Sequence, residues 1–538
     1  MEASFDMIVY SSSLDDQPGE PSGDFPDGSG PAGPVESDMA PAGLDPEPVD
    51  KCPGHPKKDA IDSAFIKECI FANEHGDGRL YTAVNHTAVR YNKTSGTWLR
   101  WEGHHWGVDH NNENSLRLVE MVVEEYLKEA RSLVDLIAKE TEKEAQAKLI
   151  NYQKSIYDRA RKLRSDRGRN NALKFVQTVD GMSIMSEDID NDPWSLPCKN
   201  GVIDLKTGEL RPGRPDEFMM IACPHNYLGV SQQCELWDRT LMEIFNNDSI
   251  LVSYIQRLFG YGITGVITEH VMPVFWGQGR NGKSMIVETI RHTLGPLAGP
   301  VLPEMLLDQG FFRSSGGPSP DIMALKGLRL AFASETDEGR RISSSKVKML
   351  TGGDSLRARN PHDRYETTFQ PTHKLFLMTN HKPHADANDF AFWERLHLVP
   401  FLLSFVTRVP SVENERAADP GLPVKLRAEA SGILSWLVRG CLEWQQSGLD
   451  PPMLIREATQ QYRKDEDLVG EFIDARCLVG ETLSVKATEL YTAFTDWYVE
   501  NCGARVPSQK KFGTMLGKKF EKKKTPQWVY FGLCLATF

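Results

Sequence analysis

The chain has 538 residues, of which 40% are hydrophobic and 25% charged, and its formal net charge is −12. A chain of this length exceeds the usual limit of one hydrophobic core, so we expect two to four folded units. Its apolar runs are too short to cross a bilayer, and its first residues lack a basic segment followed by an apolar one. These features exclude membrane and secreted proteins and predict a cytoplasmic one.

The negative charge is concentrated at the start of the chain. Residues 1–50 contain twelve Asp or Glu and no Lys or Arg, so the remainder has no net charge and is free to form basic clusters. The same segment is rich in Pro, Gly and Ser and cannot bury enough apolar surface to offset the entropy of ordering. We expect a disordered acidic tail over residues 1–58, acting as a solvating extension in preference to a nucleic-acid mimic or a partner-binding segment.

The nine cysteines are scattered along the chain and odd in number, unlike the disulfide framework of a small secreted domain. Cys52 and His55 have the spacing of half a zinc site, but no second pair of ligands stands at finger spacing. We therefore expect reduced thiols and no zinc.

Residues 59–240 have the composition of a folded, α-rich N-terminal domain. Apolar residues recur every three or four positions from Val119 to Ile137, and charged residues fill the opposite face through Arg164, which predicts one long amphipathic helix. Three tryptophans near residue 100 lie among turn signals that predict short strands. Residues 192–218 are typical of two short strands joined by the turn DLKTGE.

The segment Gly277-Gln-Gly-Arg-Asn-Gly282-Lys283-Ser284 matches the phosphate-loop pattern of Gly, four residues and Gly-Lys-Ser. The apolar run VMPVFW before it predicts a strand, and the residues after it predict a helix that ends at Gly295. Backbone N–H groups and the helix dipole at such a junction bind anions. The predicted ATP-binding residues are Gly277, Gln278, Gly279, Arg280, Asn281, Gly282, Lys283 and Ser284. Among them, Lys283 is expected to reach the β- and γ-phosphates and Ser284 to bind Mg²⁺.

Hydrolysis also needs a carboxylate that associates with the metal or polarises the attacking water. The run LRLAFAS predicts a buried strand that delivers Glu335 at its carboxyl end, so Glu335 is the predicted catalytic and metal-binding acid. Asp337 is the second choice, with a solvated turn as its alternative. The run KLFLMTN predicts another buried strand that ends in Asn380, whose amide is expected to sense the γ-phosphate, although an Asn there is ordinarily a turn former.

These residues occur in a series of blocks that resembles a known family. In order, the blocks are NGVIDLKTGELRP, FGYGITG, the phosphate loop, ASETDEGRR, VKMLTGGDSLRAR, FLMTNHKP and FWERLHLVPF. From about residue 60 to its end the chain resembles superfamily 3 helicases, specifically the helicase part of phage and plasmid primase-helicases, to which poxvirus primase-helicases are also similar. The resemblance implies an AAA+-type core over residues 241–405, a hexameric ring that hydrolyses ATP between subunits, and 3′ to 5′ movement on single-stranded DNA.

The resemblance also implies roles for single residues. By motif, Glu335 is the Walker B acid and Asn380 the sensor, with Ser334 standing where many ATPases have a first acid. Trp393-Glu-Arg395 falls where the family has Trp-x-Arg, which makes Arg395 the predicted arginine finger; the alternative is an Arg that pairs with Glu394 or another surface acid.

The priming domain of longer relatives has no counterpart that we identify in the sequence. Asp188 and Asp190 have the spacing of a metal-binding pair, but they lie in a polar run before the NGV block. We therefore expect a separate primase as partner.

Residues 355–369 read as a hairpin with its turn at Asn360 to Asp363. In superfamily 3 helicases a hairpin before the sensor strand projects into the channel of the ring. The cations expected to follow the DNA backbone are Arg357, Arg359, His362 and Arg364. The alternative is a solvated hairpin with ordinary surface charges.

The C-terminal part is predicted to be a helical connector over residues 406–465 and a winged helix over residues 466–538, since two helical patterns precede two apolar runs. Residues 505–524 hold eight Lys or Arg and one Glu, and Ser508 is placed to cap a helix. The lysines expected to face duplex or origin DNA are Lys510, Lys511 and Lys518. A basic helix without a DNA partner is the alternative.

Together these features predict an α/β protein with an AAA+-type P-loop core, an α-rich N-terminal domain and a C-terminal winged-helix domain. We expect a homohexameric helicase that uses ATP and Mg²⁺ to unwind origin DNA of a phage, plasmid, prophage or virus in the host-cell cytoplasm. The alternative is an ATP-switched initiator that binds and melts the origin without sustained translocation. A metabolite kinase with a P-loop would need neither the hairpin nor the basic C-terminal domain.

Overall fold

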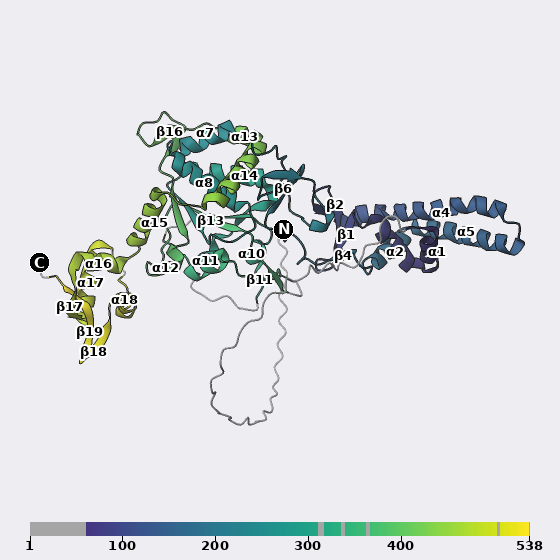
Figure 1. The fold of residues 1–538 in the computed structure, drawn as a ribbon. Helices are drawn as coiled ribbons and strands as arrows, with labels where there is room; N and C mark the ends of the chain where they lie inside the picture. The colour runs from purple at the N-terminus through teal and green to yellow at the C-terminus, as the bar shows by residue number, and fades with distance from the viewer. Residues whose placement is uncertain (1–60, 310–316, 335–338, 362–365, 503–505, 537–538) are drawn as a thin grey trace, which may run out of the picture. The chain divides into compact units, whose positions relative to one another are not determined.

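The computed structural model describes residues 61–309, 317–334, 339–361, 366–502 and 506–536 (Figure 1). By its internal contacts the chain divides between His55 and Pro56, and all of the described residues belong to the second unit. The predicted acidic tail, with Cys52 and His55, lies outside the described residues. The described part is a mixed α/β fold, which confirms the predicted class at that level, whereas the predicted domain boundaries stay predictions.

The first described part of the chain is mainly helical. Its helices are α1 (Ser63–Phe71), α2 (Asn73–Asn85), α3 (Glu113–Arg117), α4 (Val119–Lys139), α5 (Lys143–Leu163) and α6 (Asp166–Val176). The predicted strands near residue 100 are present in a four-stranded sheet of order β3-β2-β1-β4, formed by β1 (Val89–Asn92), β2 (Thr97–Trp101), β3 (Trp106–Val108) and β4 (Ser183–Ile184).

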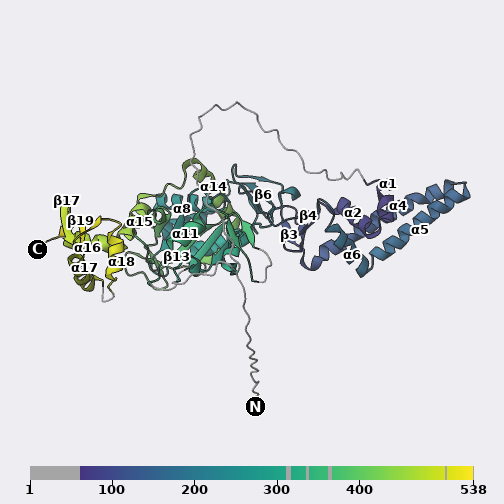
Figure 2. The same cartoon turned by 90° about the horizontal axis from the view of Figure 1, so that it is seen from below.

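The prediction of one long helix through Arg164 is wrong, because the chain reverses at residues 140–142 and forms two helices. The apolar stripe of α4 stops near Ile137, and the charged run KETEKE at residues 139–144 separates it from the apolar face of α5. After the reversal, α4 and α5 lie side by side in both views of the molecule (Figures 1 and 2). Both helices bury residues in one cluster, including Tyr126 and Leu133 from α4 and Ile156 from α5.

A small antiparallel sheet links this helical part to the centre of the molecule. It contains β5 (Ser195–Cys198), β6 (Gly201–Asp204) and β7 (Glu209–Arg211), in that order. The predicted pair of strands around DLKTGE corresponds to β6 and β7 and is confirmed, with β5 as an additional strand. Two helices follow, α7 (Glu235–Ile244) and α8 (Ser249–Gly262).

A five-stranded parallel sheet with the order β14-β8-β13-β10-β9 forms the centre. Its strands are β8 (Met272–Trp276), β9 (Ala298–Val301), β10 (Leu330–Ser334), β13 (Lys374–Thr379) and β14 (Leu396–Pro400). Such strands are covered on both faces, which explains their nearly continuous apolar sequences. The strands predicted before the phosphate loop, before Glu335 and before Asn380 are therefore confirmed.

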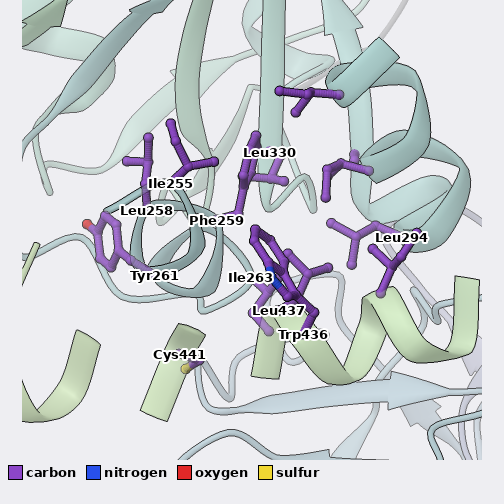
Figure 3. Packing of buried hydrophobic residues seen from close by; sticks show 14 of the residues in the cluster. Ile255, Leu258, Phe259, Tyr261, Ile263, Leu294, Leu330, Trp436, Leu437 and Cys441 are labelled. Carbon is purple, nitrogen blue, oxygen red and sulfur yellow. The ribbon is translucent and has the colours of Figure 1, made fainter. Parts of the chain in front are cut away.

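One face of the sheet packs against α8, α9 (Lys283–Leu294) and α14 (Ala430–Ser447). Figure 3 shows part of this cluster, with Phe259 of α8, Leu330 of β10 and Leu437 of α14. The helices α8 and α14 approach closely at glycine: a Cβ added to Gly260 would lie 2.1 Å from the carbonyl carbon of Gly440. A larger residue at either position would separate the two helices.

The opposite face is covered by α11 (Ser344–Thr351), α12 (Phe390–Trp393) and α15 (Met453–Asp465). Alternation along β10 divides its side chains between the two layers: Phe332 belongs to the first cluster and Ala331 to the second. The remaining elements here are the short helices α10 (Pro320–Met323) and α13 (Leu422–Ala428), the antiparallel pair β11 (Leu356–Ala358) and β12 (Thr367–Phe369), and the parallel pair β15 (Ser404–Val406) and β16 (Glu415–Ala417).

The C-terminal part has its own hydrophobic cluster. Its elements are α16 (Leu468–Arg476), β17 (Cys477–Lys486), α17 (Ala487–Asn501), α18 (Gln509–Leu516), β18 (Lys522–Thr525) and β19 (Gln527–Leu535), with the sheet order β17-β19-β18. The predicted cap is confirmed, because the Ser508 side chain accepts a hydrogen bond from the backbone N–H of Lys511 at 3.3 Å. None of the helices in the described ranges has both the length and the hydropathy that spanning a bilayer requires.

Candidate nucleotide-binding site

The phosphate loop connects β8 to α9 as the sequence predicts. It runs from Gly277 to Gly282, and α9 begins at Lys283. Gly282 has φ +90°, and a Cβ there would lie 2.8 Å from the side chain of Ile244. Only glycine fits this position without strain or displacement of its neighbour. The loop thus opens a helix N-terminus, where backbone N–H groups bind anions.

Lys283 is the buried cation of the loop, with 7% of its surface exposed. Its ammonium donates hydrogen bonds to the carbonyl oxygen of Gly277 and, at 3.0 Å, to Oδ1 of Asn380. Burial lowers the pKa of Lys283 to about 8. The structure therefore brings together the two predicted groups, Lys283 and Asn380, which are 97 positions apart. Ser284, the predicted Mg²⁺ ligand, follows at the exposed start of α9.

The neighbouring strands hold the loop in place. The backbone N–H of Gly277 donates to the carbonyl of Thr379 at 3.3 Å, which ties the start of the loop to the end of β13. The carbonyl of Arg280 accepts from the N–H of Phe405 at 2.6 Å. The sequence gives no signal for this second support, because Phe405 lies in β15, beyond the last sheet strand.

Asn281 is a buried polar residue of the loop. Its Oδ1 accepts from the backbone N–H of Lys283 at 3.4 Å, while its Nδ2 has no hydrogen-bond partner among the described residues. A buried donor without a partner costs free energy, so this amide is available for another acceptor. The exposed loop residues are Gln278, Gly279 and Arg280.

The predicted acids, Glu335 and Asp337, lie outside the described residues. The strand that leads to them is described: β10 ends at Ser334, whose partner in the register is Met378 of β13. Ser334 therefore lies at the same carboxyl edge of the sheet as Asn380, two positions beyond Met378. Strand β10 therefore ends at the carboxyl edge of the sheet, which also carries the phosphate loop. The roles of Glu335 and Asp337 stay predictions.

Arg395 lies at the amino edge of the sheet, where the parallel strands β8 and β14 begin. It precedes β14, whose residue Leu396 pairs with Met272 at the start of β8. The phosphate loop follows the end of β8, five residues later, which is about 16 Å at roughly 3.3 Å per residue. Arg395 Nη1 donates to the carbonyl of Ala391 at 2.6 Å, and its Nε is buried without a partner in the described ranges. No ion pair between Arg395 and Glu394 is present among these residues.

The predicted hairpin is present as β11 and β12, with Arg357 opposite Thr368. The Arg357 side chain is 72% exposed and forms an ion pair with Glu366. Arg359 is half-buried, and its carbonyl accepts from the N–H of Ser319 at 3.0 Å. His362 and Arg364 lie outside the described residues.

The three predicted lysines of the C-terminal part differ in their surroundings. Lys510 and Lys511 are exposed on α18. Lys518 follows that helix and forms an ion pair with Asp386, with Nζ and Oδ2 2.9 Å apart. Asp386 belongs to the segment between β13 and α12, so Lys518 already has an acidic partner within this chain. Whether any of the three binds DNA stays a prediction.

Comparison with known proteins gives viral relatives. A family model described as D5 N terminal like matches residues 77–246. Putative helicase L207/L206 of Acanthamoeba polyphaga mimivirus is 27% identical over 476 residues, which cover 84% of this chain and 48% of that protein. Putative helicase 022R of Frog virus 3 (isolate Goorha) is 24% identical over 406 residues, covering 62% and 41%. The chain thus spans about half or less of the length of these relatives.

Among solved structures, the apo C-terminal region of NrS-1 is similar, with a TM-score of 0.43 and 10% sequence identity. The alignment covers 84% of this chain and 98% of that one.

Proposed function

We propose that the chain is an ATP-dependent DNA helicase that forms a hexameric ring, moves 3′ to 5′ on single-stranded DNA and unwinds the replication origin of a phage, plasmid, prophage or virus in the host-cell cytoplasm. The observation that carries the proposal is the hydrogen bond between Lys283 and Asn380 at the phosphate loop. A cation for the phosphates and an amide beside it are the groups that position a triphosphate and an attacking water. ATP and Mg²⁺ are the proposed cofactors, with Ser284 and Glu335 as metal ligands.

The strand order supports an AAA+-type core. β13 stands between β8 and β10, so the strand that ends before Asn380 separates the phosphate-loop strand from the strand that leads to Glu335. Parallel strands bring their carboxyl ends to one edge, where open α/β sheets bind their ligands. The proposed sensor and the proposed acid then flank the γ-phosphate from neighbouring strands.

The place of Arg395 supports assembly into a ring. Within one subunit this side chain starts about 16 Å from the loop along the sheet, a distance that its own length does not span. In a head-to-tail ring, the edge of the sheet that carries Arg395 in one subunit faces the phosphate loop of the adjacent subunit. This Arg395 is the proposed arginine finger for the charge that develops on the γ-phosphate.

Two features support DNA as the substrate. The β11–β12 hairpin presents Arg357 to solvent before the strand that ends at Asn380. In the C-terminal part, the order of helix α16, strand β17, helices α17 and α18 and hairpin β18–β19 supports a winged helix with Lys510 and Lys511 on its exposed helix. A separate primase is the proposed partner.

A strand-displacement assay on forked DNA with ATP and Mg²⁺ tests the proposal. We expect displacement by the wild-type chain and none by Lys283→Ala, which removes a loop cation. The matched control is Lys425→Ala, which removes an exposed cation paired with Asp419 at 2.7 Å and should unwind normally. Forks with only a 3′ or only a 5′ tail test the direction of movement.

The same assay separates the other candidates. An ATP-switched initiator would hydrolyse ATP on origin DNA without processive displacement. A small-molecule kinase would show nucleotide turnover that DNA does not change. Either result would replace the helicase proposal.

A further inference from the structure

A hollow of about 540 Å³ lies in the C-terminal part, between the first turn of α18, the start of α17 and the β18–β19 hairpin. Its lining residues are Ala487, Thr488, Gln509, Lys510, Phe512, Gly513, Lys522, Gln527, Trp528 and Tyr530. It is remote in sequence from the phosphate loop, and its described lining includes none of the residues proposed for ATP binding or hydrolysis.

Trp528 is the aromatic side chain that this hollow offers to a ligand. Phe512 and Tyr530 also line it, but each is 1% exposed and belongs to the hydrophobic cluster of the C-terminal part. Trp528 is 51% exposed. A large ring left half in water beside a concave surface is suited to stack on another flat ring, since stacking removes apolar area from water on both sides.

The lining is positive. Among the described residues that line it are two lysines and no acidic residue. The Lys522 ammonium lies 5.0 Å from the centre of the Trp528 ring and 5.2 Å from that of Tyr530, so it is held at the aromatic wall by cation–π attraction. Nearby acids are engaged elsewhere: Glu521 pairs with Lys523 at 3.0 Å, and Glu489 pairs with Lys486 at 2.9 Å. The hollow therefore favours an anion.

We infer that this hollow binds one unpaired nucleotide of DNA at the junction between duplex and single strand. The base stacks on Trp528, and the adjoining phosphates meet Lys510 and Lys522. An aromatic platform flanked by cations is the combination that single-stranded nucleic acid requires, whereas a paired base inside a duplex has no free face to offer. The inference rests on the proposed function only in taking DNA as the ligand, and it adds a junction-reading site to the proposed winged helix.

The test measures binding of the full chain to three DNAs by fluorescence anisotropy, without ATP. The first is a blunt duplex, the second carries a two-nucleotide overhang, and the third carries the same overhang without bases. We expect tighter binding to the overhang duplex than to the blunt one. The abasic overhang should lose this preference, because it keeps the phosphates and lacks the ring that stacks.

Variants localise the preference to the hollow. Trp528→Ala should weaken binding to the overhang duplex by about 5- to 150-fold, the range for loss of one base–aromatic stack, and leave binding to the blunt duplex nearly unchanged. Trp528→Phe keeps a ring and should retain most of the preference. Because Trp528 is half exposed, the thermal unfolding of both variants should match that of the wild type.

Two neighbouring lysines provide a matched pair of charge variants. The Lys522 ammonium lies over the aromatic rings of the hollow. The Lys523 ammonium lies 5.6 Å from the centre of the Phe531 ring and pairs with Glu521. The two lysines point to opposite sides because alternate residues of a strand do so. Lys522→Ala and Lys523→Ala remove the same charge. We expect the first to reduce the ratio of overhang to blunt affinity and the second to leave that ratio unchanged.

Three outcomes overturn the inference. The first is equal binding of the wild type to overhang and blunt duplex, and the second is a preference for the overhang that Trp528→Ala leaves intact. The third is that a poly-glutamate peptide displaces the overhang duplex as effectively as unlabelled overhang DNA does. The last result would assign the hollow to an acidic protein partner. ATPase and strand displacement are measured separately. A Trp528-dependent preference without a motor would therefore refute the proposed helicase and leave this site standing, and the reverse also holds.

Discussion

Lys283 is a buried ammonium whose charge depends on pH in an accessible range. Burial lowers its pKa to about 8, so the nucleotide-free protein loses this charge above pH 8, while the unfolded chain keeps it until a higher pH. Folding stability contributed by this group therefore increases with pH above 8, because the unfolded state then binds more protons. ATP favours the charged form, so binding must restore the proton.

We therefore expect the affinity for Mg·ATP to fall as pH rises from 8 to 9.5, by at most about tenfold per pH unit for a single group. The measurement is calorimetry in two buffers of different ionisation enthalpy, which also detects the proton taken up. Lys283→Arg is the control, since a guanidinium stays charged over this range. An identical pH dependence in that variant would assign the titration to another group.

Glu335 is the proposed catalytic acid, a role that separates ATP binding from hydrolysis. Replacement by Gln keeps the shape but removes the carboxylate that polarises water, so Glu335→Gln should bind ATP and lose turnover by at least about 100-fold. Equilibrium binding of a fluorescent ATP analogue and steady-state ATPase measure the two effects. Asp337→Asn is the paired variant, and loss of turnover there, with normal turnover in Glu335→Gln, would move the catalytic role to Asp337.

At the scale of elements, the helices α2 and α5 are joined by a buried ion pair. Arg159 is 7% exposed and Asp77 1%, with Nε of Arg159 2.9 Å from Oδ1 of Asp77. Arg159→Met leaves a buried carboxylate without its cation, so we expect a loss of about 3–5 kcal/mol in the free energy of opening of this helical part. Hydrogen exchange of the α5 amides measures that free energy locally.

Two variants check the cause of this loss. Adding Asp77→Asn to Arg159→Met removes the charge but keeps an acceptor for the Tyr126 hydroxyl, and it should restore most of the stability. Arg161→Met removes an exposed cation from the same helix, 3.8 Å from Asp158, and should change stability by less than about 1 kcal/mol. A large loss in Arg161→Met would mean that helix propensity, and not the buried pair, is responsible.

At the scale of the whole molecule, the separation of Arg395 from the phosphate loop predicts a shared active site. Lys283→Ala and Arg395→Ala should each abolish ATPase, yet a mixture should recover part of it. In a freely exchanging equimolar ring, about a quarter of the interfaces would pair an intact loop with an intact finger from the adjacent subunit.

ATPase at a series of mixing ratios measures this recovery, and mass measurements establish that both variants form and exchange rings. Arg456→Ala, an exposed arginine paired with Asp450 at 3.0 Å, is the control and should be active alone. If rings form and exchange but no ratio restores activity, Arg395 does not act across subunits.

Short contiguous segments of the sequence were sufficient to predict many of the structural elements of this chain. The phosphate loop, the strands before Glu335 and Asn380, the hairpin after Leu356 and the Ser508 cap are all predictable, because each depends on a few neighbouring residues and on the period of the local backbone. The same local reading missed the reversal between α4 and α5, since a charged stretch continues a helical pattern as readily as it ends one.

Contacts between segments that are distant in the sequence could not be predicted from such local signals. The meeting of Lys283 with Asn380, the support of Arg280 by Phe405, the pairing of Lys518 with Asp386 and the position of Arg395 at the far edge all follow from strand order and helix packing. These are set by how apolar faces from separate parts of the chain cover one another, and many chain paths satisfy the same local periodicities. Residue identities and spacing therefore predicted a phosphate loop and its candidate partners, while the packing of the sheet determined which of those residues lie together.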